Sequence, residues 1–223
     1  MSALSAPARR LVRRFGTGEL VLHWGYAVLF AVLLLTGLGL YLPPGQNPVL
    51  ARRELVREIH LAAAIGLLLL PVLVAGAWPR SVAGFWHDVE RFDADDAGWL
   101  RRVVVPRRLR RRPLPSQDRF NAGQKLNSIV VAAATVGFIV TGCLMWQGEH
   151  LPTSLSEAAD SWHIWLMLAM LPLIAGHLVL SLLLPSTRPA MRGIITGRVR
   201  LDFARRRHAK WTARMAERGE PAD

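Results

Sequence analysis

Four long apolar segments, separated by polar and arginine-rich stretches, dominate the pattern of this 223-residue chain. Each segment is close to the 20 residues that an α-helix needs to cross about 30 Å of hydrocarbon. Prolines follow three of them, where a helix cannot continue. The pattern predicts membrane-spanning helices over residues 20–42, 60–78, 125–146 and 162–184.

The polar parts of the chain are expected to lie outside the membrane. In the connection over residues 79–124, the acidic stretch Asp93–Asp96 and the arginine run Arg107–Arg112 are both expected at the surface. The tail covers residues 185–223. No internal repeat is apparent. We therefore expect an all-α integral membrane protein, a four-helix transmembrane bundle in which residues 1–223 form a single domain.

Charge sets the expected orientation of this bundle. A formal net charge of +12 could indicate nucleic-acid binding, but the arginines cluster beside the apolar segments, which favours contact with membrane lipid and no nucleic acid. Four spans place both termini on one side. That side carries 25 of the 28 lysines and arginines. The positive-inside rule then predicts that both termini are cytoplasmic, in a multi-pass protein of the bacterial inner membrane.

Four histidines lie inside these spans or at their mouths: His23, His60, His163 and His177. An imidazole in hydrocarbon is costly, so each is a candidate functional residue. The predicted topology puts His60 and His163 at the outer side, and His23 and His177 at the cytoplasmic side. His163 and His177 would share one helix, about 21 Å apart along its axis and on nearly the same face. The histidines thus form two pairs at two depths.

Two imidazoles at each of two depths suit the axial positions of haem better than a zinc site, which needs four converging ligands. Iron with two histidine ligands has no free position, so the expected role is electron transfer. The chain has one cysteine, Cys143, expected to be a small core residue, and no CxxCH motif, so haem would be held by coordination and packing. His87, His150 and His208 fall outside the spans and are expected to be solvated.

Two functions of other classes remain open. A membrane transporter could use the histidines, but it would want acidic groups inside the membrane, and the spans have none beyond Glu19 at an edge. A purely structural membrane anchor would leave the matched depths of the histidines unexplained.

Further motifs accompany the four histidines: Asn121-Ala122-Gly123-Gln124-Lys125 before the third span, Thr36-Gly37, Thr141-Gly142, the tail segment Arg192-Gly193-Ile194-Ile195-Thr196-Gly197-Arg198-Val199, and His208-Ala209-Lys210-Trp211. With them, nearly the whole chain resembles the di-haem cytochrome b gamma subunit of membrane-bound respiratory formate dehydrogenase. Related cytochromes of Ni/Fe hydrogenase and thiosulfate reductase share the paired histidines and remain alternatives.

This resemblance implies two b haems, whose axial ligands would be His23, His60, His163 and His177. It also implies a pocket for quinone (menaquinone or ubiquinone) beside the cytoplasm-side haem. Matching positions place Asn121, Gly123 and Gln124 in that pocket. An asparagine amide can donate a hydrogen bond to a quinone carbonyl, although Asn121 could also simply cap the third helix. Lys125 could serve a reduced quinone or a haem propionate, or its long side chain could snorkel to the surface.

The resemblance also implies partner subunits. They are an iron–sulfur beta subunit and a catalytic alpha subunit that contains molybdenum or tungsten. The chain has no iron–sulfur cysteines, so it is not expected to oxidise formate alone and no catalytic residue is assigned. The expected role is that of the electron-transfer and quinone-reducing subunit of an oxidoreductase complex in anaerobic respiration.

Overall fold

The computed structural model describes residues 10–43, 45, 47, 50–109 and 111–219. The chain forms two compact units, which are described separately. The helix unit comprises Thr17–Val82 and Ala134–Ala175. The terminal unit comprises Met1–Gly16, Ala83–Ala133 and Gly176–Asp223.

Four helices in the described part of the chain are long and apolar enough to cross a membrane: α1 (Thr17–Tyr41), α2 (Arg53–Ala77), α5 (Ala122–Trp146) and α6 (Thr153–Leu178). The last continues as a π-helical turn over Val179–Leu183. The predicted mostly helical fold with four candidate spans is confirmed. Short 3-10 turns over Leu50–Arg52 (η3) and Gly148–His150 (η5) lie in the connections.

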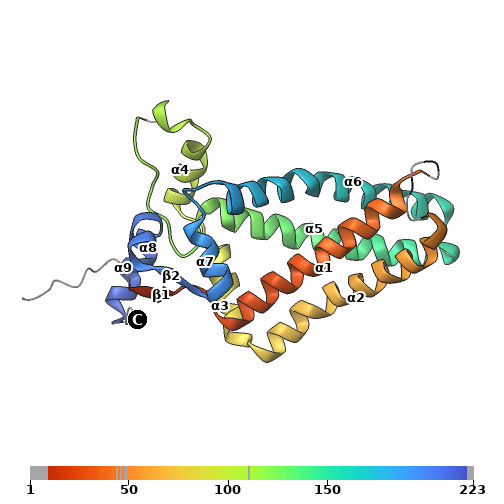
Figure 1. Cartoon of the computed structure of the whole chain (residues 1–223), viewed down its shortest axis with the longest axis horizontal. Coiled ribbons are helices and arrows are strands. Elements are labelled where there is room, and N and C mark those ends of the chain that lie inside the picture. The colour runs from red at the N-terminus through yellow and green to blue at the C-terminus, as the bar shows by residue number, and fades with distance from the viewer. Residues whose placement is uncertain (1–9, 44, 46, 48–49, 110, 220–223) are drawn as a thin grey trace, which may run out of the picture. The chain divides into compact units, whose positions relative to one another are not determined.

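Within the helix unit, α1 and α2 run side by side in opposite directions (Figure 1). Two glycines permit this close packing. A Cβ on Gly25 of α1 would lie 2.6 Å from the Leu70 side chain of α2, and a Cβ on Gly66 of α2 would lie 3.1 Å from the Leu29 side chain of α1. A glycine of each helix therefore packs against a leucine of the other, and such small residues allow membrane helices to approach closely.

Two of the long helices begin well before the apolar spans predicted for them. The helix α2 starts at Arg53 and α6 at Thr153, whereas the predicted spans start at residues 60 and 162. The added turns are polar and include the exposed ion pair of Arg57 with Glu54 at 3.4 Å. Hydropathy reports only the apolar part of a helix, so it does not predict such polar extensions.

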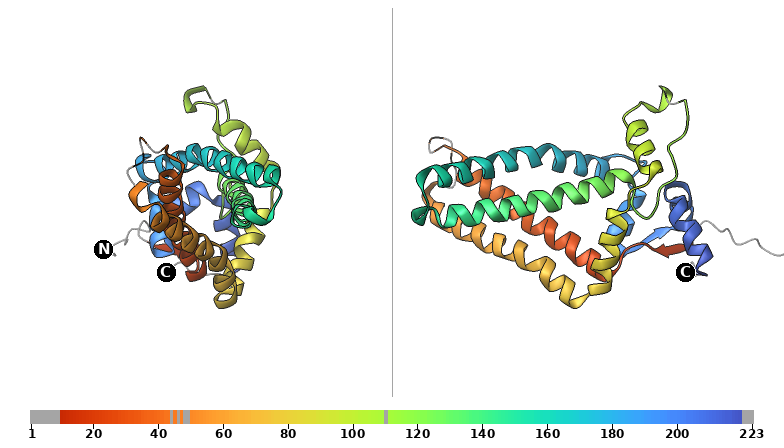
Figure 2. Two further views of the ribbon diagram at one scale, coloured as in Figure 1. Left: turned by 90° about the vertical axis from the view of Figure 1, so that its right-hand side faces the viewer. Right: turned by 180° about the vertical axis from the view of Figure 1, so that it is seen from behind.

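The terminal unit contains a two-stranded antiparallel sheet that the pattern did not predict. The strand β1 (Leu11–Arg13) pairs with β2 (Arg198–Arg200) (Figure 2). Helix α7 (Pro189–Thr196) precedes β2 and ends at Gly197, whose φ of 75° is left-handed backbone that glycine adopts without strain. The Gly197 carbonyl then accepts hydrogen bonds from two backbone amides that follow β1.

Short helices make up the rest of the polar segments: α3 (Pro79–Glu90), α4 (Ala94–Val103), the 3-10 turn η4 (Arg107–Leu109), α8 (Leu201–Arg207) and α9 (Ala209–Glu217). The core of the terminal unit joins the sheet to the last two helices through Val12, Val199, Phe203, Ala204 and Trp211. In the predicted arginine run, Arg108, Arg111 and Arg112 are exposed, and Arg110 lies outside the described residues.

Candidate functional site

Two of the four predicted ligands, His60 of α2 and His163 of α6, face each other in the helix unit. Their ring centroids are 6.3 Å apart. Two imidazoles bound on opposite sides of one metal ion have centres about 6 Å apart, because each metal–nitrogen bond is about 2 Å long. The spacing therefore fits one iron ion between the two rings, and the donor set suits the axial positions of haem.

Each imidazole is hydrogen bonded through Nδ1 to a threonine on the neighbouring helix. Thr36 Oγ1 lies 2.8 Å from His60 Nδ1, and Thr141 Oγ1 lies 2.8 Å from His163 Nδ1. Each hydroxyl also donates to the carbonyl four residues earlier in its own helix, at 2.7 Å. Because a hydroxyl has one proton to give, the threonine oxygen accepts from the histidine Nδ1–H. The Nε2 atoms of both rings are then left with a lone pair that a metal can bind.

Glycines next to both threonines lie beside the imidazoles. A Cβ on Gly37 would lie 3.4 Å from His60 Cε1, and a Cβ on Gly142 would lie 3.7 Å from His163 Cε1. The Phe138 ring meets the His163 ring edge-on, with centroids 5.1 Å apart. Side chains and backbone from all four long helices therefore surround the histidine pair.

The other two predicted ligands belong to different units. His23 lies in α1 in the helix unit, where its ring meets Trp24 at a centroid distance of 5.5 Å. His177 lies near the end of α6 in the terminal unit and is exposed. It directly precedes Leu178 and the π-helical turn over Val179–Leu183, a distortion that is frequent at functional sites. Their pairing stays a prediction.

Two of the predicted quinone-binding residues form the cap of α5. The Asn121 Oδ1 accepts from the Gln124 backbone N–H at 2.9 Å, and the Gln124 Oε1 accepts from the Asn121 backbone N–H at 3.0 Å. This reciprocal capping box satisfies donors at the helix start, so the capping role considered for Asn121 is confirmed. Among the described residues, neither side-chain amide nitrogen has a hydrogen-bond partner, so each keeps two N–H donors.

The third predicted quinone residue, Gly123, packs against an aromatic ring of α4. A Cβ on Gly123 would lie 3.1 Å from Trp99 Cζ3 and 3.3 Å from Asn121 Oδ1. The missing side chain therefore allows the indole to contact the first turn of α5. Arg14 donates from Nη2 to Gln124 Oε1 at 3.2 Å, which places a positive charge beside the cap.

Comparison with known proteins agrees with this geometry. A family model described as prokaryotic cytochrome b561 matches residues 14–197. The chain belongs to the prokaryotic cytochrome b561 family. A cytochrome b of this family is an electron-transfer protein, and its cofactor is haem b. The four long apolar helices make this cytochrome a multi-pass membrane protein.

Relatives of this cytochrome cover almost all of its length. A protein of Haemophilus influenzae named formate dehydrogenase, cytochrome b556 subunit, is 21% identical over 217 residues, which are 95% of this chain and 86% of that protein. The cytochrome b556 subunit of the nitrate-inducible formate dehydrogenase of Escherichia coli K12 is 20% identical over 194 residues, covering 85% and 84%. A second formate dehydrogenase cytochrome b556 subunit of that strain is 23% identical over 212 residues, covering 91% and 92%.

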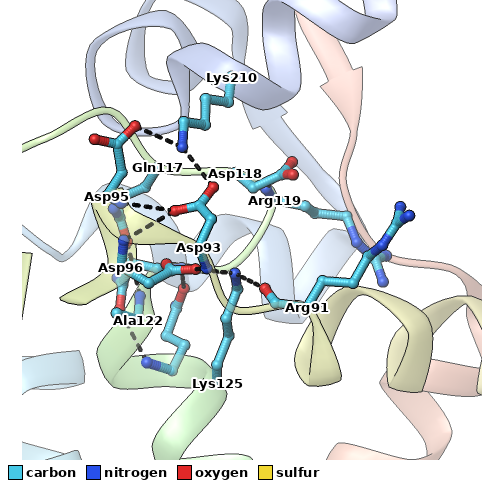
Figure 3. Close-up of polar contacts among 12 residues, drawn as sticks. Arg91, Asp93, Asp95, Asp96, Gln117, Asp118, Arg119, Ala122, Lys125 and Lys210 are labelled. Atoms are coloured by element: carbon cyan, nitrogen blue, oxygen red, sulfur yellow. Dashed lines mark hydrogen bonds and ion pairs between the residues drawn. The ribbon is translucent and has the colours of Figure 1, made fainter.

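A buried ion pair in the terminal unit of the cytochrome joins α5 to α4 (Figure 3). The Lys125 Nζ lies 2.7 Å from the Asp96 Oδ2, and the two side chains are only 4% and 3% exposed. The Nζ also donates to the Arg91 carbonyl at 2.6 Å. Of the two roles left open for Lys125, snorkelling to the surface is therefore excluded, and the prediction that the whole acidic stretch is at the surface is wrong for Asp96. Asp96 can be buried because Lys125 supplies the counter-charge that a buried carboxylate requires.

Of the other two aspartates of the stretch, Asp93 is exposed, as predicted, and Asp95 is half-buried. Lys210 of α9 lies 2.6 Å from both Asp93 and Asp95 (Figure 3). Its hydrogen bond holds the pKa of Asp93 below the usual range. Asp93 also caps α4, because its carboxylate accepts from the backbone N–H groups of Asp95 and Asp96.

The cytochrome buries a histidine that was expected to be solvated. His208, between α8 and α9, is 3% exposed. Its Nδ1–H donates to the Asp118 carbonyl at 2.6 Å. Burial, reinforced by the charges of Arg14 and Arg207, lowers the pKa of His208 to about 3. This imidazole is therefore neutral at physiological pH and ties the tail to the loop before α5. The other two histidines outside the spans are exposed, as predicted.

Sequence reasoning gave Thr36 and Thr141 no individual role. A signal was nevertheless present, because each Thr-Gly pair precedes the histidine of the next long helix by a similar distance, 24 residues for His60 and 22 for His163. The two helix pairs of the cytochrome thus carry the same short pattern, although no repeat was apparent in the sequence as a whole.

Proposed function

We propose that this cytochrome is the membrane subunit of a respiratory formate dehydrogenase, which carries electrons from an iron–sulfur subunit through two b haems to quinone. The observation that carries the proposal is the facing pair of His60 and His163, with Nε2 of both rings left available to one iron. The choice of formate dehydrogenase within the family is supported by the names of the relatives, which match at least 85% of the chain.

In this proposal each residue has a limited task. His60 and His163 would hold one haem, and His23 and His177 would hold the other. Haem b supplies reversible one-electron transfer, and the protein supplies its ligands, orientation and electrostatics. The presence of one histidine on α1, one on α2 and two on α6 supports two sites, and the π-helical turn after His177 supports a specialised end of α6.

We also propose the orientation and the partners. The strong excess of arginine in the terminal segments and in the 79–124 connection supports cytoplasmic termini in a bacterial inner membrane. The site of His60 and His163 would then face the outer side, where an iron–sulfur subunit would deliver electrons from a molybdenum- or tungsten-containing catalytic subunit. Quinone would be reduced at the other side and take its protons from the cytoplasm.

The proposed quinone-binding residues are Asn121, Gly123 and Gln124. The chemistry that supports them is the set of amide N–H donors that the capping box leaves available at the start of α5. A quinone carbonyl accepts such bonds, and the positive charge of Arg14 beside Gln124 would stabilise negative charge on a reduced quinone.

The proposal is tested by the substrate that reduces the haems. The chain is isolated with its natural partners through an affinity tag, and optical spectra are recorded after anaerobic addition of formate, hydrogen or thiosulfate. We expect formate to produce the bands of reduced b haem, and a quinone analogue to reverse them. Reduction by hydrogen or thiosulfate but not by formate would assign the chain to another complex of the same family.

The quinone site is tested by Asn121→Asp. Aspartate caps a helix as well as asparagine does, but its carboxylate has no N–H to donate. We expect quinone reduction to fall about tenfold, the value of one hydrogen bond, while formate still reduces both haems. The control is Asp93→Asn, the converse exchange at the cap of α4, which should leave quinone reduction unchanged. An unaltered rate in Asn121→Asp would limit this residue to capping.

A further inference from the structure

The two threonines that contact the histidine pair form a matched set. Thr36 lies on α1 and bonds His60 of α2, while Thr141 lies on α5 and bonds His163 of α6. Both bonds join Oγ1 to Nδ1 at 2.8 Å, and both hydroxyls donate to the carbonyl four residues earlier. The pair of α1 with α2 and the pair of α5 with α6 therefore make the same hydrogen bond to their imidazoles.

We propose that Thr36 and Thr141 are positioning residues that hold both axial histidines in the Nδ1–H tautomer and set the reduction potential of the haem between them. This proposal rests on the proposed function, because it takes His60 and His163 as the ligands of one iron. It adds a role for two residues that do not touch the metal.

The direction of each hydrogen bond gives the first part of the argument. A threonine hydroxyl whose proton is committed to a carbonyl of its own helix can only accept from a neighbouring ring nitrogen. The Nδ1 of each histidine must then carry the proton, and the Nε2 lone pair is free for iron. Without this acceptor, the His163 imidazole would keep an unsatisfied N–H in one tautomer, and in the other it would present a protonated nitrogen to the metal. His60 has a further hydrogen bond to the Leu33 backbone.

The chemical nature of the acceptor gives the second part. A hydrogen bond from Nδ1–H to an acceptor makes the imidazole a more basic ligand. A more basic ligand stabilises ferric over ferrous iron and lowers the potential. A hydroxyl is a neutral acceptor, so it increases ligand basicity less than a carboxylate would. The two threonines therefore set a moderate potential, and the loss of either should raise it.

The packing around the rings gives the third part. A Cβ on Gly37 or Gly142 would lie 3.4 and 3.7 Å from the Cε1 atoms of the two rings, which are ordinary contact distances, so each imidazole lies close to the helix that bears its threonine. Each ring is thus held by a hydrogen bond to a threonine and lies beside the glycine that follows this threonine. The threonine hydroxyl is the side-chain acceptor at each ring.

The test compares valine and serine at both positions in the isolated complex. Thr36→Val and Thr141→Val keep the shape of the side chain and remove the acceptor, whereas Thr36→Ser and Thr141→Ser keep it. Haem content is measured by pyridine haemochromogen, the midpoint potential by equilibrium redox titration, and the ligand field by electron paramagnetic resonance of the oxidised haem. We expect each valine variant to move the potential of one haem upward and to change its g values, with serine restoring both.

Thr135→Val is the matched control, because Thr135 is also buried on α5 but contacts Tyr26 of α1 instead of an axial histidine. It should leave the potential of this haem unchanged. Loss of the haem in a valine variant that serine restores would also support the proposal. Unchanged potential and g values in both valine variants would overturn it, and so would equal shifts in valine and serine. A wild-type complex without haem would instead overturn the proposed function.

Discussion

Replacing His163 by alanine should remove about one of two haems per chain and stop formate from reducing the one that remains. The ring centroids of His163 and His60 are 6.3 Å apart. With His60 alone, a single imidazole would bind one side of the porphyrin, which is not enough to keep the haem low-spin and bound. The second site would keep its own histidines, so the loss should be confined to one haem. Because electrons are proposed to enter at the outer site, the remaining haem would be reduced by dithionite but not by formate.

The control for this prediction is His150→Ala in the turn after α5. His150 is exposed and lies outside the histidine pair, so both haems and the formate-driven reduction should survive. Pyridine haemochromogen and formate-reduced spectra of the two variants give the comparison. Full haem content in His163→Ala would refute the assignment of this residue as an axial ligand.

Replacing Lys125 by methionine should strongly destabilise the start of α5. The exchange keeps an unbranched side chain of nearly the same length but leaves the Asp96 carboxylate, whose side chain is 3% exposed, without its counter-charge. Breaking a buried pair in this way costs about 3–5 kcal/mol, because a charge remains in a poorly solvated place. Amide hydrogen exchange in α4 and in the first turns of α5 should accelerate accordingly.

The same exchange at Lys210 is the matched control. Lys210 pairs with Asp93 and Asp95, but its side chain is 30% exposed and the two aspartates are 54% and 47% exposed. Exposed pairs contribute about 1 kcal/mol or less, so Lys210→Met should change the exchange rates little. The double variant Lys125→Met with Asp96→Leu should recover much of the lost protection. Similar effects of Lys125→Met and Lys210→Met would contradict the burial of the first pair.

The features that sequence reasoning predicted well depend on local or summed properties. Apolar length alone locates the four long helices. The order of the spans predicts the depth of each histidine. The equal depth predicted for His60 and His163 correctly indicated that these two residues approach each other. The choice of Asn121 as a possible cap followed from residue type and position, and the structure confirms the capping box.

The features that sequence reasoning missed depend on contacts between residues that are far apart in the chain. Asp96 meets Lys125, and His208 meets the carbonyl of Asp118, across separations that no local pattern reveals. Strands as short as β1 and β2 have too few residues to show an alternating pattern. Cys143 was expected in the core but is exposed. In a helix that is apolar on every side, hydropathy cannot tell a packed face from an outer one.

The most direct test of the central claim is the haem content and spectrum of the wild-type complex. The account predicts about two b haems per chain by pyridine haemochromogen, both low-spin with two histidine ligands in electron paramagnetic resonance. A purified, intact chain that contains no haem, or whose haems are high-spin with an open iron position, would contradict it.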